Sequence, residues 1–137
     1  MMTYLKKISA ALAFASLSGM ALAAANPLSV HILDLQSGQP TAGVTVTLEQ
    51  KRGTDWKQLS SAVTNAQGRI AAMYPAETPM QAGDYRIVFQ TGEHYARLKQ
   101  ETFFPEIPVQ FHVEKTDQHY HIPLLLSPFG FSTYRGN

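Results

Sequence analysis

The sequence has no cysteine and no excess of either charge: eleven basic residues are balanced by ten acidic ones, for a formal net charge of +1. The absence of cysteine excludes a small domain held by disulfides, a thiol nucleophile and a thiolate metal site. Nucleic-acid-binding proteins carry a clustered basic excess, so the balanced charge predicts no nucleic-acid partner. The 137 residues, 45% of them hydrophobic, suffice for one ordinary domain and are few for two.

The N-terminal residues have the features of a secretory signal peptide. Lys6 and Lys7 form a positive start, and an apolar run diluted by serine and glycine follows over 8–22 and ends on an Ala-Leu-Ala cleavage signal. An uncleaved anchoring helix is the alternative, but the run is short for a membrane span of about 20 residues. We predict a signal peptide over 1–23, a single domain over 24–137, and a periplasmic product with no membrane segment in its mature form. Cleavage would remove two basic residues and no acidic ones, leaving a net charge of −1.

The rest of the chain has the pattern of an all-β sandwich, in which short apolar stretches alternate with turn residues. Alternation of apolar and polar residues, clearest in 44–48 and 107–113, indicates strands with one buried face. Residues 91–102 lose this period and favour one short helix, and 51–55 form a polar loop. The predicted fold is a two-sheet β-sandwich of about eight strands. These strands are 28–33, 44–48, 56–63, 69–74, 85–89, 107–113, 119–126 and 131–135.

Pro123 falls inside one of the predicted strands. Proline has no N–H to donate to the ladder of hydrogen bonds, so we expect an edge strand or a bulge at this position. A sandwich must also protect its open edges, and pairing those edges between subunits is one way to do so. The strand pattern therefore indicates an oligomer.

Four titratable or cationic side chains are predicted to point away from the core. His31 lies between two residues of a buried face, so the alternation of the strand turns it outward. His119 and His121 share an outward face in a later strand, and Arg69 follows a turn glycine at the start of another. Any one of them alone is compatible with an ordinary solvated position. Together they are the candidates for chemistry.

Three kinds of chemistry are compatible with these residues. His119 and His121 form a feasible zinc pair with His31 as a third ligand, although no carboxylate accompanies them. A Ser-His-Asp hydrolase is disfavoured because there is no Gly-x-Ser-x-Gly motif. A metal-free hydrolysis needs a neutral imidazole to take a proton from water and a guanidinium, here Arg69, to stabilise the oxyanion. Spacing alone does not choose between the first reading and the third.

Three segments resemble the transthyretin family. Residues 28–34, Leu-Ser-Val-His-Ile-Leu-Asp, are similar to its first signature, and 120–132, from Tyr-His-Ile-Pro-Leu to Phe-Gly-Phe-Ser, are similar to its second. Between them, 103–107 resemble the stretch that follows the short helix of the family. The resemblance covers essentially all of 28–137 and implies a transthyretin-like two-sheet sandwich.

Within that family the resemblance is to the enzyme branch rather than to the hormone carriers. His31, Arg69 and His121 stand where the carriers have lysine, glutamate and threonine, and the chain ends Tyr-Arg-Gly-Asn, close to the Tyr-Arg-Gly-Ser ending of 5-hydroxyisourate hydrolases. The resemblance implies hydrolysis of 5-hydroxyisourate in urate breakdown, with no metal and no organic cofactor. It also implies a homotetramer whose active sites lie in a channel between subunits. A small-ligand carrier without catalysis remains the alternative.

The resemblance implies a role for each candidate residue. His121, assisted by His31, would activate water, and Arg69 would bind the substrate and the developing oxyanion. Tyr134 would hydrogen-bond the substrate, which His31 and Arg69 would also contact.

Three further residues are candidates for supporting roles. His119 could orient His121, and Arg135 is expected to be structural. Asn137 stands in place of the usual terminal serine; an amide can position substrate or water but cannot relay a proton as a hydroxyl does.

Overall fold

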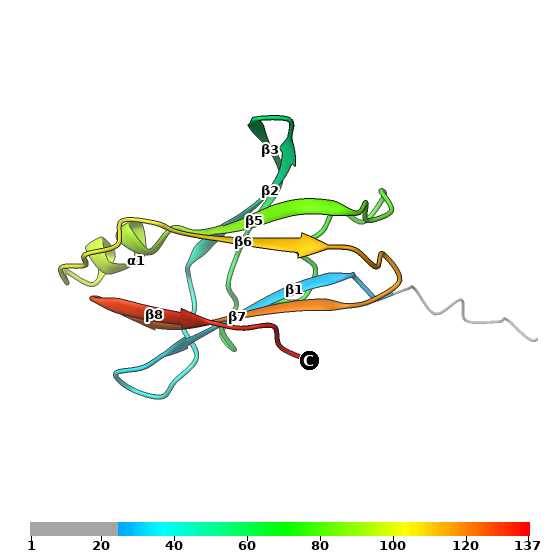
Figure 1. Ribbon diagram of the computed structural model, residues 1–137. Helices are drawn as coiled ribbons and strands as arrows, with labels where there is room; N and C mark the ends of the chain where they lie inside the picture. The colour runs from blue at the N-terminus through cyan, green and yellow to red at the C-terminus, as the bar shows by residue number, and fades with distance from the viewer. Residues whose placement is uncertain (1–24) are drawn as a thin grey trace, which may run out of the picture.

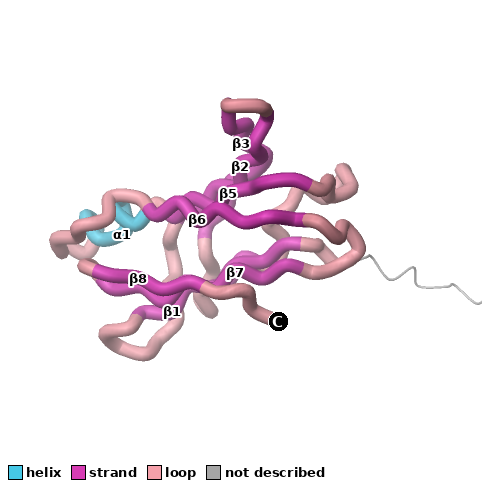
Figure 2. Tube along the Cα trace, in the orientation of Figure 1, coloured by secondary structure: helices cyan, strands magenta, loops and turns pink. Residues whose placement is uncertain are grey.

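The computed structural model describes residues 25–137, so the signal peptide predicted over 1–23 lies outside the described residues. Two four-stranded sheets lie face to face and enclose one core (Figures 1 and 2). Eight strands and one short helix are present in this part of the chain, which confirms the predicted all-β sandwich.

The first sheet has the strand order β4-β1-β7-β8, and the second has the order β3-β2-β5-β6. Strands β1 and β7 run parallel, and every other paired neighbour is antiparallel. The first sheet consists of β4 (Arg69–Ile70), β1 (Leu28–Asp34), β7 (Tyr120–Ser127) and β8 (Gly130–Thr133). The second consists of β3 (Asp55–Val63), β2 (Thr45–Arg52), β5 (Gly83–Phe89) and β6 (Ile107–Val113), with the helix α1 (Thr91–Arg97) between β5 and β6.

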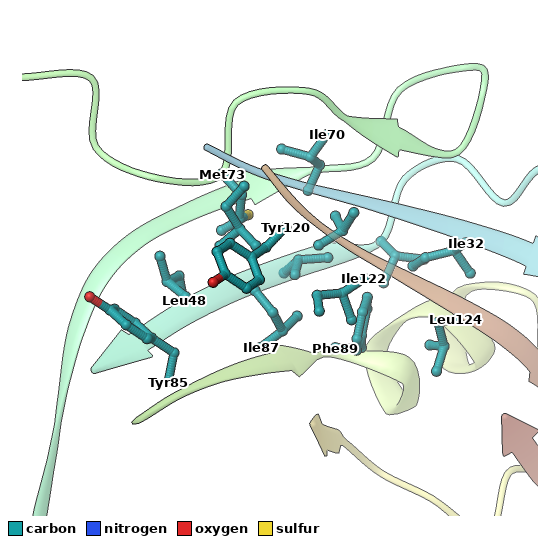
Figure 3. Packing of buried hydrophobic residues seen from close by; sticks show 14 of the residues in the cluster. Ile32, Leu48, Ile70, Met73, Tyr85, Ile87, Phe89, Tyr120, Ile122 and Leu124 are labelled. Carbon is teal, nitrogen blue, oxygen red and sulfur yellow. The ribbon is translucent and has the colours of Figure 1, made fainter. Parts of the chain in front are cut away.

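Strand alternation in the sequence correctly identifies the core. Leu28, Val30 and Ile32 of β1 are fully buried, as are Val46 and Leu48 of β2. Their side chains meet those of the facing strands between the sheets (Figure 3). Because successive side chains of a strand point to opposite faces, the intervening residues of β1 face the other way. The outer face of the β4-β1-β7-β8 sheet is therefore where the candidate site residues must lie.

Several predicted boundaries are wrong. The loop expected over 51–55 is a tight hairpin, since β2 continues to Arg52 and β3 begins at Asp55, with Gly53 at a φ of 63°. This hairpin projects beyond the sandwich (Figure 1). The short helix expected within 91–102 is confirmed; it has seven residues and ends at Arg97, because the backbone turns left-handed at Lys99 with a φ of 55°. No helix within residues 25–137 is long and apolar enough to cross a membrane.

Pro123 does not mark an edge strand, contrary to the sequence-based prediction. It lies in β7, between β1 and β8. The Tyr120 N–H donates to Pro27 on the β1 side, so the alternation of the strand places the nitrogen of Pro123 on the opposite side. There the β8 ladder stops at the Leu124–Thr133 pair, and the Thr133 hydroxyl donates to the Pro123 carbonyl over 2.8 Å. The missing N–H therefore costs no hydrogen bond with β1.

Candidate active site

Strand pairing on the first sheet brings three of the predicted residues together. His31 in β1 is the register partner of Arg69 in β4, and His121 in β7 is the register partner of Ser29 in β1. Ser29 and His31 are two residues apart in one strand, so both point to the outer face. The imidazoles of His31 and His121 are stacked, with ring centroids 6.4 Å apart and an interplanar angle of 28°.

Burial and charge favour the neutral forms of both histidines. Partial burial lowers the pKa of His31 below its ordinary value of 6.5, and the charge of Arg69 lowers it further, whereas a hydrogen bond to the Gln67 backbone acts in the opposite direction. Burial also lowers the pKa of His121 below 6.5, followed by the charges of Arg69, His31 and His119. A neutral imidazole has a free ring nitrogen that can accept a proton, and the neighbouring guanidinium can stabilise an oxyanion. The cluster is therefore suited to activating water beside a polarised carbonyl.

Ser29, which was not among the sequence-based candidates, links two of the histidines. Its Oγ lies 2.7 Å from Nδ1 of His121 and 2.9 Å from Nε2 of His119. His119 was proposed as a supporting residue able to orient His121, and the structure joins the two through this hydroxyl rather than directly. Ser29 has the same outward alternation as His31, which was the available signal. Its contact with His121 depends on the pairing of β1 with β7, which alternation does not reveal.

Gly136 is a second residue missed by sequence reasoning. Its N–H donates to the His121 carbonyl over 2.9 Å, and an added Cβ would lie 2.5 Å from Cδ2 of the His121 ring. The C-terminal segment thus covers the imidazole, which explains why an outward-facing side chain is only 9% exposed. Only glycine fits against the ring without moving it.

Within one chain, Tyr134 and Arg135 contact groups outside the histidine cluster. Tyr134 is 57% exposed and lines a separate hollow of about 220 Å³ beside β6, together with Phe111. Arg135 places its guanidinium 4.6 Å from the centre of the Tyr120 ring and donates to the Gln118 side chain, consistent with a structural role. Asn137 is exposed at the end of the chain.

A hollow of about 440 Å³ borders the site beside Arg69. Ser29, His119 and Arg69 are among its polar residues, and Ile70 and Ala72 are among its apolar ones. This hollow is open to solvent in a single chain, so a second surface would be needed to enclose a ligand in it.

The zinc alternative finds no ligand cluster in the described part of the chain. Among residues 25–137, no three histidine, aspartate or glutamate side chains are grouped as ligands of one metal ion. Nε2 of His119 and Nδ1 of His121 both contact the Ser29 hydroxyl.

Comparisons with known proteins identify one family and several similar chains. The model of the HIUase/Transthyretin family matches residues 28–136. A 5-hydroxyisourate hydrolase of Salmonella typhi is 53% identical over 137 residues, covering 97% of this chain and 100% of the relative.

Two solved structures show that the fold is shared by proteins with different functions. The Klebsiella pneumoniae 5-hydroxyisourate hydrolase superposes with a TM-score of 0.70 at 41% identity, covering 82% of this chain and 94% of the other. Sea bream transthyretin in complex with thyroxine superposes with a TM-score of 0.75 at 33% identity, covering 80% of this chain and 94% of the other. Since backbone similarity does not separate an enzyme from a carrier, the side chains of the site must do so.

Proposed function

The chain belongs to the HIUase/Transthyretin family, and on that basis we propose that it hydrolyses 5-hydroxyisourate to 2-oxo-4-hydroxy-4-carboxy-5-ureidoimidazoline. The substrate is a polar purine-like ring system with a cyclic amide. The observation that carries the proposal is that His31 and His121, whose pKa values are lowered, stack against each other beside Arg69 on one face of the sheet. A proton acceptor and an anion-binding group are the two elements that this hydrolysis requires.

The proposed mechanism assigns one role to each residue of the cluster. His121, assisted by His31, takes a proton from water, and the water oxygen bonds to the cyclic carbonyl carbon. Arg69 binds the substrate and the resulting oxyanion through its planar set of N–H donors. When the ring C–N bond breaks, the proton passes from the histidine to the leaving nitrogen. This cycle uses only the side chains of the site and water.

The test of the proposal is the decay of freshly generated 5-hydroxyisourate, formed in the assay by uricase and followed by its absorbance. The purified Arg69→Glu variant should stay folded and lose most of its turnover, because a carboxylate repels an oxyanion. Arg52→Glu is the matched control, since Arg52 lies at the β2–β3 hairpin, in the other sheet, and donates to the Gln50 side chain. If the wild-type protein does not accelerate decay, or if Arg69→Glu leaves it unchanged, the proposed function is wrong.

A small-ligand carrier is the second candidate, favoured by the TM-score of 0.75 with a transthyretin bound to thyroxine. The side chains argue against it, because Arg69 and His119 line the hollow beside the site, where a carrier of apolar hormones needs a less reactive surface. Tight binding of thyroxine without any acceleration of hydrolysis would support the carrier. Turnover without such binding supports the enzyme.

We also propose a homotetramer with the active sites between subunits. β6 and β8 are terminal strands of their sheets, and within residues 25–137 no strand pairs with their outer edges; Phe129 and Phe131 are exposed beside β8. In this assembly Tyr134 keeps its proposed substrate-binding role. Its exposed ring is free to contact the active site of a neighbouring subunit. Sedimentation should give four times the mass of one chain, and Phe131→Glu should shift the protein toward smaller species.

The final proposal is that residues 1–23 are a cleaved signal peptide and that residues 24–137 act in the periplasm. The positive start, apolar run and Ala-Leu-Ala sequence support it. Cell fractionation after expression of the full chain should place the protein in the periplasm, and N-terminal sequencing should begin at residue 24. Replacing Lys6 and Lys7 by glutamate should leave the protein uncleaved in the cytoplasm.

A further inference from the structure

A chain of three hydrogen bonds runs from the backbone of Asn26 to the imidazole of His121. Nδ1 of His119 lies 2.9 Å from the Asn26 carbonyl oxygen, and Nε2 of His119 lies 2.9 Å from the Ser29 hydroxyl. The same hydroxyl lies 2.7 Å from Nδ1 of His121. Every group in this chain has a limited choice of donor and acceptor roles, and those limits determine where the protons are.

The Asn26 carbonyl sets the donor and acceptor roles in this series of hydrogen bonds. A carbonyl oxygen can only accept, so the hydrogen of neutral His119 must be on Nδ1, which leaves Nε2 as an acceptor. The Ser29 hydroxyl has one hydrogen and gives it to that nitrogen. The oxygen of Ser29 must then accept from His121, so the hydrogen of His121 is on Nδ1 and its lone pair is on Nε2.

The starting point of the chain is held in place. The side-chain oxygen of Asn26 accepts from the N–H groups of Leu28 and Tyr74, at 3.1 and 3.2 Å, and its amide nitrogen donates to the Tyr74 carbonyl over 2.7 Å. These bonds tie the residues before β1 to the residues that follow β4. The carbonyl that orients His119 is therefore not free to turn away.

We propose that Ser29 and His119 are positioning residues that hold His121 in the tautomer with its hydrogen on Nδ1, so that Nε2 is the atom that takes the proton from water. This inference rests on the proposed hydrolysis. The water proton moves to Nε2 as the water oxygen bonds to the carbonyl carbon, and it leaves with the ring nitrogen when the C–N bond breaks. No proton moves along the three hydrogen bonds between Asn26 and His121. These bonds contribute because the Ser29 oxygen turns a lone pair toward the imidazolium form of His121 and stabilises it.

The tautomers can be measured without any substrate. Long-range proton–nitrogen NMR of the 15N-labelled wild-type protein, at a pH where the histidines are neutral, distinguishes protonated from unprotonated ring nitrogens. We expect Nδ1 to be protonated in both His119 and His121. A wild-type protein that hydrolyses 5-hydroxyisourate with the hydrogen of His121 on Nε2 would overturn the inference and leave the proposed function intact. A wild-type protein that does not hydrolyse it overturns the proposed function, whatever the tautomer.

Variants of Ser29 test the functional consequence. Ser29→Ala should move His121 toward the Nε2-protonated tautomer and lower kcat about 10- to 100-fold, with a smaller change in KM. Ser29→Thr keeps the hydroxyl and should restore both the His121 tautomer and kcat. A purely structural role of Ser29 would not explain this recovery. Ser61→Ala is the matched control, since Ser61 is an exposed serine of a strand in the other sheet. Unchanged kcat and tautomer in Ser29→Ala would overturn the inference.

Discussion

Gly136 and His121 are in contact through both backbone and side chain. The N–H of Gly136 donates to the His121 carbonyl over 2.9 Å, and the space where a Cβ of residue 136 would lie is occupied by the His121 ring, with Cδ2 2.5 Å away. The fourth residue of the Tyr-Arg-Gly-Asn ending, Asn137, is exposed, whereas the third fixes a candidate catalytic side chain.

Gly136→Ala should therefore lower kcat without unfolding the protein. The added methyl group must displace either the imidazole or the C-terminal segment, and a displacement of about 1 Å at a catalytic group can cost about 100-fold in rate. The measurement is kcat, alongside a thermal unfolding curve. Gly130→Ala is the control, since its backbone, like that of Gly136, is not left-handed and its Cβ would meet nothing nearer than the Ser127 Oγ at 3.8 Å. Full activity in Gly136→Ala would mean that the position of His121 does not depend on this contact.

His121→Ala and His31→Ala should have unequal effects. Loss of the proton acceptor should lower kcat/KM about 100- to 10,000-fold, and loss of His31, which assists it, should cost less. His112→Ala is the control, because His112 is exposed and pairs with Asp84 on the other sheet. A larger loss in His31→Ala than in His121→Ala would exchange the two roles.

The pH dependence follows from the lowered pKa values of His31 and His121. Because both pKa values lie below 6.5, both imidazoles stay neutral at pH 7 and become protonated only in more acidic solution. We expect kcat/KM to be level from about pH 8 to pH 7 and to fall below 6.5. A profile that rises as the pH falls through this range would contradict a neutral histidine base.

Conformational stability should change with pH in the same direction. The unfolded chain, with ordinary histidine pKa values of 6.5, binds these protons more readily than the folded one, in which burial lowers the pKa of His31, His94 and His121. The stabilisation is therefore complete above 6.5 and is lost as the pH falls through the lowered values. Urea unfolding at pH 7.5 and at pH 5 should show the lower stability at pH 5.

Activity should survive removal of metal. His119 and His121 are joined through Ser29, and no ligand cluster forms among residues 25–137. After exhaustive chelation the turnover of 5-hydroxyisourate should be unchanged, with the metal content confirmed by elemental analysis. Loss of activity that returns on addition of zinc would instead support the zinc reading.

Gly68→Ala should destabilise the fold at the entrance to β4. Gly68 has a φ of +69°, and its Cβ would lie 2.5 Å from the Ile32 carbonyl oxygen and 2.9 Å from the Thr41 nitrogen. We expect the free energy of unfolding to fall by about 1–3 kcal/mol, measured by urea denaturation. Gly38→Ala has the same left-handed backbone, with a φ of +72°, but open space at the Cβ, so it should cost less. Equal losses would mean that backbone strain alone decides the effect.

The sequence by itself determined which residues face the core. Alternation of apolar and polar side chains is a local property, because the direction of each side chain follows from its place in the strand. It identified the buried face of β1 and turned His31 outward, and this was confirmed. Boundaries that depend on tight turns, such as the hairpin at Gly53, were less well predicted, because the polar residues of a strand end resemble those of a loop.

Only the tertiary structure decided which outward residues meet. Ser29 and His121 are 92 residues apart in the sequence and become register partners because β1 and β7 pair in parallel. A shift of one residue in that register would turn each contact to the opposite face of the sheet. Long-range register depends on the packing of the whole core, which no local pattern contains. The sequence therefore determined which side chains are available for catalysis, and the fold determined which of them are hydrogen-bonded to one another.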